Sequence, residues 1–284
     1  MQEKKIKDFD SYKKEYEKSI ENPEGFWEEK ANNFLWKKKW DNVLSWDFSK
    51  PEVKWFEGGK LNITENCLDR HLENIGDQTA IKWIANNPEE KSRCLSYTEL
   101  HSEVCKFSNV LKNNGAKKGD RICLYMPMVP ELAIAVLACA RIGAIHSVVF
   151  AGFSSKSLSD RINDANCTIL ITADGSFRGD KITPLKDISD EAMKTTPTIQ
   201  KCIVLKRTNT EINMKDVRDI WWSEEIENVD NDCTAEIMDS EDPLFILYTS
   251  GSTGKPKGIV HSTAGYMVYT EFSFRNVFQY DEGD

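Results

Sequence analysis

The chain has 284 residues, of which 40% are hydrophobic and 29% are charged. This composition excludes an intrinsically disordered chain. The 37 basic and 46 acidic side chains give a net charge of −9, so we expect neither nucleic acid nor an anionic membrane as a partner.

The sequence predicts a cytoplasmic protein. The lysines near the N-terminus are not followed by an apolar core, so a secretory signal is not expected. The longest apolar run, residues 132–140, is about half of the roughly 18 residues that a membrane helix needs. The 8 cysteines are scattered without any C-x-x-C spacing, which favours reduced thiols in the cytosol over a zinc site.

Residues 1–60 are predicted to form a helical, aromatic cap. An amphipathic helix is indicated by helical spacing of Phe9, Tyr12, Tyr16 and Ile20. Five tryptophans follow: Trp27, Trp36, Trp40, Trp46 and Trp55. We interpret these rings as packing the cap onto the main body, with a tryptophan-lined binding surface as the alternative.

From residue 61 onward, expected strands alternate with expected helices. Ser96 and Glu99 have the spacing of a capping box, and the helix that they open should end at Asn114 and Gly115. Two further helices are expected over 130–142 and 154–163, the first opened by a proline. Strands are expected over 122–126, 145–150, 168–172, 202–205 and 244–248. Their apolar character on both faces predicts an α/β fold with a mostly parallel sheet and flanking helices.

A candidate phosphate-binding loop follows the last of these strands. Glycines allow backbone N–H groups to approach an anion, hydroxyls add donors, and ammonium groups neutralise phosphate charge. The Walker-A pattern is not satisfied, because Pro256 occupies the position of its Ser or Thr. A flexible linker between domains is the alternative. The candidate ligands are Thr249, Ser250, Gly251, Ser252, Thr253, Gly254, Lys255 and Lys257.

Residues 248–258, Tyr-Thr-Ser-Gly-Ser-Thr-Gly-Lys-Pro-Lys-Gly, resemble the phosphate-loop signature of the adenylate-forming enzymes. Within that superfamily the chain is similar to the AMP-forming acetyl-CoA synthetases. The resemblance to them rests on residues 66–71, 125–130, 138–144, 145–150, 218–222 and 241–247. It implies that residues 1–60 are that family's N-terminal extension. Residues 61–284 would be the N-terminal part of the AMP-binding domain, truncated at its C-terminal side.

The resemblance also implies a ligase reaction in two steps. ATP and acetate would first give acetyl-AMP and pyrophosphate with Mg²⁺, while residues 249–257 hold the β- and γ-phosphates. The thiol of CoA would then displace AMP and form acetyl-CoA.

A CoA site is implied for Arg178, Gly179, Asp180 and Lys181, in which the two cations contact phosphates of CoA. A planar guanidinium group suits phosphate, because it donates two parallel hydrogen bonds. Asp180 stands where the family usually has glycine, and its carboxylate should weaken CoA binding unless it points away. Two solvated loop cations are the alternative. Phe150 could lie near CoA or belong to the core.

The catalytic lysine and the acyl pocket of the family are expected beyond Asp284, so no catalytic residue is assigned, and metal ligands are not identified. We expect an incomplete fragment that is inactive alone. The alternatives are a propionyl- or other short-chain acyl-CoA ligase, or a non-catalytic nucleotide- or CoA-binding module if the chain ends naturally at Asp284. The four histidines are expected to be structural; they are His71, His101, His146 and His261. Met126 and Met128 are expected to lie in the core.

Overall fold

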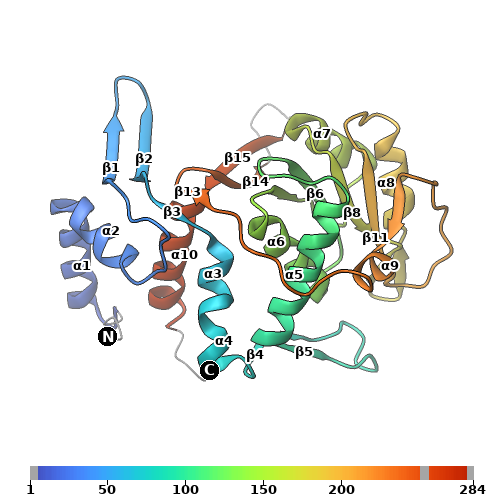
Figure 1. Cartoon of the computed structure of the whole chain (residues 1–284), viewed down its shortest axis with the longest axis horizontal. Coiled ribbons are helices and arrows are strands. Elements are labelled where there is room, and N and C mark those ends of the chain that lie inside the picture. The colour runs from blue at the N-terminus through green and yellow to red at the C-terminus, as the bar shows by residue number, and fades with distance from the viewer. Residues whose placement is uncertain (1–5, 250–255, 280–284) are drawn as a thin grey trace. The chain divides into compact units, whose positions relative to one another are not determined.

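The computed structural model describes residues 6–249 and 256–279 (Figure 1). It divides into two compact units. The terminal unit combines residues up to 63 with residues 237–242 and those from 262 onward. The sheet unit comprises residues 64–236 and 243–261. Within the described residues, no helix has the length and apolar character required to cross a membrane.

The sheet unit is built on a seven-stranded sheet of order β12-β11-β8-β6-β7-β14-β15. The five pairings from β12 to β14 are all parallel, as predicted. The strands are β6 (Arg121–Tyr125), β7 (Ile145–Val148), β8 (Ile169–Ala173), β11 (Lys201–Leu205), β12 (Asp219–Trp221), β14 (Pro243–Thr249) and β15 (Lys257–Ser262).

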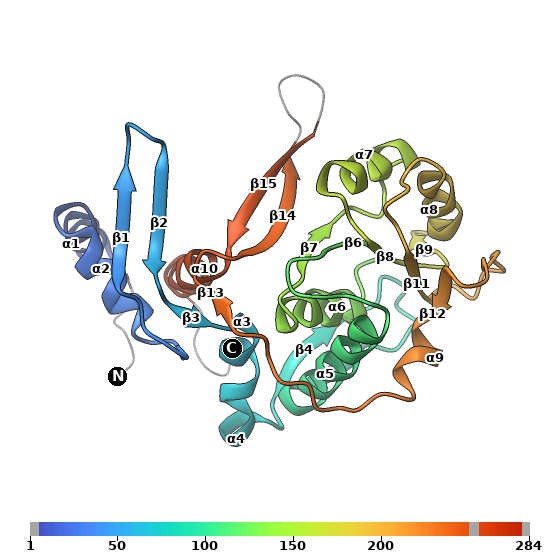
Figure 2. The same cartoon turned by 45° about the horizontal axis from the view of Figure 1, so that its top comes forward.

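Helices cover both faces of this sheet (Figure 2). Ile122 and Leu124 of β6 face one hydrophobic cluster, and Cys123 and Tyr125 face the other. Burial on both faces explains why the strands are continuously apolar in sequence. The helices are α5 (Tyr97–Asn113), α6 (Pro130–Arg141) and α9 (Trp222–Ile226) on the first face, and α7 (Ser155–Ala165) and α8 (Leu185–Met193) on the second.

The predicted caps of α5 and the predicted start of α6 are confirmed, whereas α7 ends at Ala165 and not at the expected Asn163. Ser96 Oγ accepts from the Glu99 N–H at 3.1 Å, and a Glu99 carboxylate oxygen accepts from the Ser96 N–H at 2.8 Å. Beyond the C-termini of α5 and α6, Gly115 and Gly143 have φ of 91° and 72°, where a side chain would be strained. The strand expected over 145–150 is shorter in the structure, where β7 ends at Val148.

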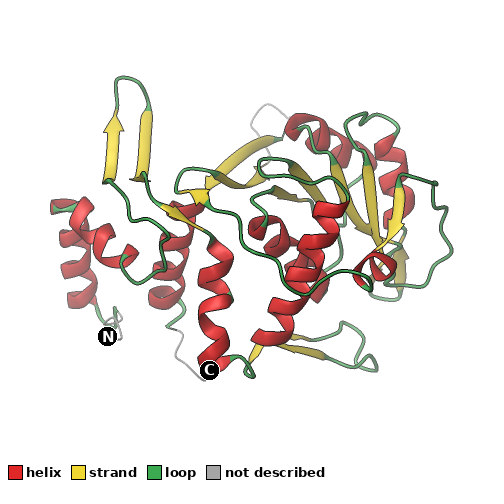
Figure 3. Cartoon of the chain, viewed as in Figure 1, coloured by secondary structure: helices red, strands yellow, loops and turns green. Residues whose placement is uncertain are grey.

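The remaining elements of the sheet unit are short and lie outside the large sheet (Figure 3). Two antiparallel pairs occur, β4 with β5 and β9 with β10. These elements are α3 (Ile63–Cys67), the 3₁₀ helix Asp69–His71, α4 (Leu72–Ile75), β4 (Thr79–Trp83), β5 (Arg93–Ser96), β9 (Ser176–Arg178) and β10 (Lys181–Thr183).

The terminal unit joins the two ends of the chain in one small core. Its elements are α1 (Phe9–Glu21), α2 (Pro23–Ala31), β1 (Asn42–Asp47), β2 (Glu52–Glu57), β3 (Lys60–Leu61), β13 (Met238–Asp239) and α10 (Thr263–Val277). Phe56 and Leu61 are buried with Met267 and Val268 of α10. Four of the five tryptophans pack against this core as predicted, namely Trp27, Trp36, Trp40 and Trp55. Trp46 is 60% exposed and does not.

The apolar face of α1 differs from the prediction. The helix forms, but none of its residues is buried, and Phe9, Tyr12, Tyr16 and Ile20 are all exposed. The rings stack along the helix instead, with centroids 6.3 Å apart for Phe9 and Tyr12 and 6.1 Å apart for Tyr12 and Tyr16. Helical spacing therefore identified the helix but not a packing partner.

Two buried cations connect elements of the sheet unit that are distant in sequence. Arg141 of α6 donates to both carboxylate oxygens of Asp69, at 2.9 and 3.0 Å, and to the carbonyl of Cys233 at 2.6 Å. Lys186 of α8 is fully buried and pairs with Asp190 at 2.7 Å and Asp219 at 2.9 Å. Each cation is stabilised in the core because it is fully paired.

The eight cysteines are free, and six of them are buried. Burial raises the pKa of the Cys202 thiol to about 12, so this thiol stays protonated at neutral pH. The buried cysteines therefore act as small apolar side chains, as the sequence predicted.

His146 of β7 is a buried histidine within an aromatic stack. Its ring centroid lies 5.4 Å from that of Phe245, whose other neighbour in the stack is His261 at 4.4 Å. Burial lowers the pKa of His146 to about 4. His101 differs, because hydrogen bonds to Asp69 and Cys105 raise its pKa to about 9 although burial acts against the rise.

The pKa of His146 predicts a loss of stability in acid. Above its unfolded pKa of 6.5 the ring is neutral in both states, and as the pH falls towards 4 only the unfolded chain takes up the proton. The free energy of unfolding should fall by up to about 3 kcal/mol over this range. Urea unfolding at pH steps from 7 to 4 measures it.

Two variants isolate this effect from the titration of carboxylates. His146→Phe should flatten the acid slope by the amount that His146 contributes. His101→Gln should leave the slope below about pH 5.5 unchanged, because a histidine with a raised pKa is by then protonated in both the folded and the unfolded state. Equal acid slopes for the wild type and His146→Phe would contradict the prediction.

Candidate functional site

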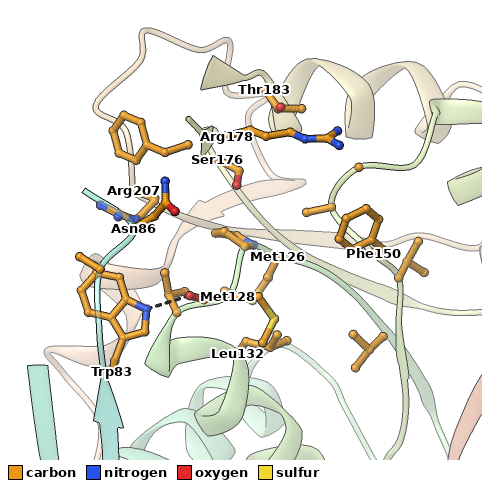
Figure 4. A pocket seen from close by; sticks show the side chains of 18 of the residues that line it. Trp83, Asn86, Met126, Met128, Leu132, Phe150, Ser176, Arg178, Thr183 and Arg207 are labelled. Atoms are coloured by element: carbon orange, nitrogen blue, oxygen red, sulfur yellow. Dashed lines mark hydrogen bonds between the residues drawn. The ribbon is translucent and has the colours of Figure 1, made fainter. Parts of the chain in front are cut away.

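A large cavity of the sheet unit, about 820 Å³, lies where the parallel strands end (Figure 4). Its lining comes from the segments that follow β6, β7, β8 and β11, and from Leu247 near the end of β14. The sheet order changes direction at β6, which has β7 on one side and β8 on the other. Ligands of open α/β sheets bind in the crevice at such a point.

The walls of this cavity are mostly apolar. Trp83, Asn86 and Arg207 lie along one side, and Phe150 lies on the other (Figure 4). The Trp83 indole N–H donates to the carbonyl of Met128 at 2.8 Å, which connects β4 to the segment after β6. An apolar lining with a few polar groups is typical of a site for an organic ligand.

This cavity is lined by three residues that the sequence analysis assigned to the core or left open. Met126 is buried, as predicted, but Met128 is 80% exposed, so its assignment to the core was wrong. The reason is that β6 ends at Tyr125 and the chain then turns across the sheet edge before α6. Phe150 is 62% exposed and packs its edge against Phe153, with 5.7 Å between the ring centroids.

The predicted CoA residues form the tip of the β9–β10 hairpin. Arg178 pairs with Lys181 in the ladder, which leaves Gly179 and Asp180 as a two-residue turn. Gly179 has φ of 60° while Asp180 does not have a positive φ, as in a type II′ turn with glycine first. Arg178 and Gly179 line the cavity, whereas Lys181 is exposed outside it. Neither cation has an ion-pair partner among the described residues.

Asp180 lies beside a different cavity. This second cavity, of about 420 Å³, is lined by Asp180 and Glu90 together with Asn86, Phe177 and Arg207. Asp180 does not line the larger cavity, which Arg178 does. Asp180, which stands where the family usually has glycine, thus lines a different cavity from Arg178.

The base of the hairpin is fixed by Asp174, which the sequence analysis did not identify. Asp174 is fully buried, and its carboxylate accepts from the N–H groups of Gly175 at 2.7 Å, Arg207 at 2.8 Å and Thr208 at 2.9 Å. It therefore joins the end of β8 to the end of β11. The one available signal was an Asp-Gly pair directly after a buried strand, a pattern typical of a turn.

The candidate phosphate loop is described only at its two ends. Ser250, Gly251, Ser252, Thr253, Gly254 and Lys255 lie outside the described residues. Thr249 is the last residue of β14 and Lys257 the first of β15, and both are exposed. Because β14 is parallel to β7, the loop begins at the same sheet edge as the cavity.

The strands that flank the loop are held by Tyr248. Its hydroxyl donates to Asp164 of α7 at 2.7 Å, and Arg161 lies 5.5 Å from the centroid of its ring. Burial, followed by the Asp164 hydrogen bond, raises the pKa of Tyr248, so the hydroxyl remains a donor. A side chain at Gly258 of β15 would come within 3.2 Å of the Tyr248 ring, so glycine allows this close approach.

A preformed metal site is not found within the described ranges. No group of three or more His, Cys, Asp or Glu residues is placed there to hold an ion. Lys257 and Arg178 instead offer positive charge near the sheet edge, which suits an anionic ligand.

Two family models match the chain. Residues 68–284 match the one described as AMP-binding enzyme, and residues 12–67 match acetyl-coenzyme A synthetase N-terminus. An acetyl-coenzyme A synthetase of Bdellovibrio bacteriovorus is 54% identical over 274 residues, which cover 96% of this chain and 42% of that protein. An acetyl-coenzyme A synthetase of Alkalilimnicola ehrlichii is 51% identical over 276 residues, which cover 97% of this chain and 43% of that protein.

A solved structure has the same fold. Acetoacetyl-CoA synthetase from Streptomyces lividans is 27% identical and matches with a TM-score of 0.86 over 94% of this chain and 41% of that one. The likeness confirms the predicted fold class. The chain spans about two fifths of the length of these relatives.

Proposed function

The chain belongs to the AMP-binding enzyme family, and on that basis we propose that it supplies the phosphate-binding and CoA-binding parts of an AMP-forming acetate–CoA ligase. In the first step, an acetate oxygen attacks the α-phosphorus of ATP, and pyrophosphate leaves. In the second, the CoA thiol attacks the carbonyl carbon of acetyl-AMP, and AMP leaves with the electron pair of the broken C–O bond.

The observation that supports this proposal is the meeting of two elements at one sheet edge. Arg178 lines the cavity from the β9–β10 hairpin, and β14 reaches the same cavity through Leu247 before the loop sequence begins. The proposed sites for the nucleotide polyphosphate and for CoA therefore border one cavity. A ligase that passes an acyl group from one to the other requires this proximity.

The residues have separate roles in the proposal. Residues 249–257 hold the β- and γ-phosphates, and their hydroxyl, amide and ammonium groups stabilise the charge that develops on pyrophosphate as it leaves. Arg178 and Lys181 bind phosphates of CoA. Mg²⁺ accompanies the ATP phosphates as part of the substrate.

Acetate is the proposed acyl substrate, because the relatives named acetyl-coenzyme A synthetase share 51–54% of their residues with the chain. The relative named acetoacetyl-CoA synthetase shares 27%. Eight free cysteines agree with a reducing cytosol as the proposed location.

The first functional prediction concerns the products. The full-length protein should catalyse acetate-dependent exchange of labelled pyrophosphate into ATP, and should release AMP when CoA is added. The reason is that the loop sequence resembles that of the adenylate-forming enzymes and lacks the Walker-A pattern, so the attack is expected at the α-phosphorus. Parallel assays with propionate, butyrate and acetoacetate test the acyl preference.

Two outcomes would contradict this proposal. ADP and acetyl phosphate as products would show attack at the γ-phosphorus. Binding of ATP and CoA without any pyrophosphate exchange would instead identify a non-catalytic binding module.

The second functional prediction separates the two half-reactions. Arg178→Ala removes a charge-assisted contact to phosphate, so the apparent KM for CoA should rise while pyrophosphate exchange stays near the wild-type rate. The expected loss is about 1.5–3 kcal/mol, or about 10- to 150-fold. Initial rates of both half-reactions at varied CoA concentration measure it.

Lys156→Ala is the matched control. Lys156 is an exposed cation of α7 that pairs with Asp160 and does not line the cavity. Lys156→Ala should leave the rates of both half-reactions unchanged. An unaltered dependence on CoA in Arg178→Ala would disprove the assignment of the hairpin as the CoA site.

A further inference from the structure

Arg207, in the loop after β11, occupies the gap between the β9–β10 hairpin and the end of β4. Its guanidinium carbon lies 4.8 Å from the ring centroid of Phe177 and 5.4 Å from that of Trp83. Nη2 donates to Glu90 at 2.7 Å, and the side chain is only 19% exposed. Arg207 lines the larger cavity, which Figure 4 shows, and also the second cavity.

The hairpin has little other support beyond its base. β9 and β10 pair with each other alone, as a two-stranded sheet of three residues each. Phe177 is 43% exposed and Ile182 is 47% exposed, so neither is anchored in the core. An isolated two-stranded hairpin is at best marginally stable in water.

The base of the hairpin is held to the loop after β11. Asp174 accepts N–H groups from both segments, and a Cβ atom at Gly175 would lie 2.7 Å from Thr208 Oγ1. These contacts fix the start of β9 but not the orientation of its tip. The contact of Arg207 with Phe177 is one residue away from Arg178 and can fix that orientation.

The charge of Arg207 is already paired, whereas that of Arg178 is not. Glu90 neutralises Arg207, and two aromatic rings lie within cation–π distance of its guanidinium group. A phosphate would have to displace Glu90 to bind there. Among the described residues, Arg178 has no acidic partner and lines the cavity directly.

We infer that Arg207 is a positioning residue for the CoA-binding hairpin. It joins the hairpin, through Phe177, to Trp83 and Glu90, and so holds Arg178 at the wall of the larger cavity. The identity of the ligand rests on the proposed function, but the mechanical role of Arg207 does not.

The test begins with the ligand-free protein. Arg207→Met keeps an unbranched chain but removes the planar charge, so backbone amides of residues 176–183 should exchange with deuterium about fivefold faster. Arg207→Lys keeps the pairing with Glu90 and loses the planar contact, so it should give an intermediate rate. Arg275→Met, which removes an arginine paired with Glu271 in α10, should give the wild-type rate.

Kinetics of the full-length protein then provide the second readout. Arg207→Met should raise the apparent KM for CoA about fivefold, with kcat and acetate-dependent pyrophosphate exchange near wild type. Phe177→Leu should reproduce both effects with Arg207 and Glu90 intact, which also covers the case in which Arg207→Met does not fold.

Unchanged amide exchange in both Arg207→Met and Phe177→Leu would overturn the inference. A raised KM for CoA with unchanged amide exchange would also overturn it, because Arg207 would then contact the ligand itself. Absence of pyrophosphate exchange in the wild type would refute the proposed function, while the amide exchange result would still decide the role of Arg207.

Discussion

Parallel pairing is the constraint on which the rest of the sheet unit depends. Because β12, β11, β8, β6, β7 and β14 run in the same direction, every one of these strands ends at the same sheet edge. The segments after β6, β7, β8 and β11 have no other place in which to meet. The cavity, the β9–β10 hairpin and the start of the phosphate-loop sequence therefore share one edge without direct pairing between them.

The sequence motifs that carry the family resemblance serve different physical purposes. Residues 66–71 and 138–144 meet through the bidentate pair of Asp69 with Arg141, and residues 218–222 supply Asp219 to the buried Lys186. Trp222 of the same segment stacks on Phe107 with 3.6 Å between the ring centroids. These motifs hold the core, whereas residues 125–130 and 145–150 contribute the walls of the cavity.

Most of the fold could be predicted from local patterns, because burial on both faces and helix capping leave a signal within a few residues. The Ser96 capping box and the proline at the start of α6 are examples. Helical spacing could not show that the apolar face of α1 is left exposed, because spacing identifies a face of a helix and not the elements that cover it. Asp174 and Arg207 were missed for a related reason. Their partners lie 34 and 117 residues away, and a single sequence gives no measure of such contacts.

The terminal unit has a consequence for how the chain is made. Its core needs Phe56 and Leu61 from the first quarter of the chain, and Ala264 and Val268 from near residue 270. At about 5–20 residues per second, a ribosome needs roughly 10–40 seconds to synthesise the intervening segment. During this interval the tryptophan-rich segment has been made while α10 has not, and its apolar rings are accessible to chaperones. Synthesis rate and chaperone supply should therefore limit the yield of this unit more than that of the sheet unit, whose core is mostly contiguous in sequence.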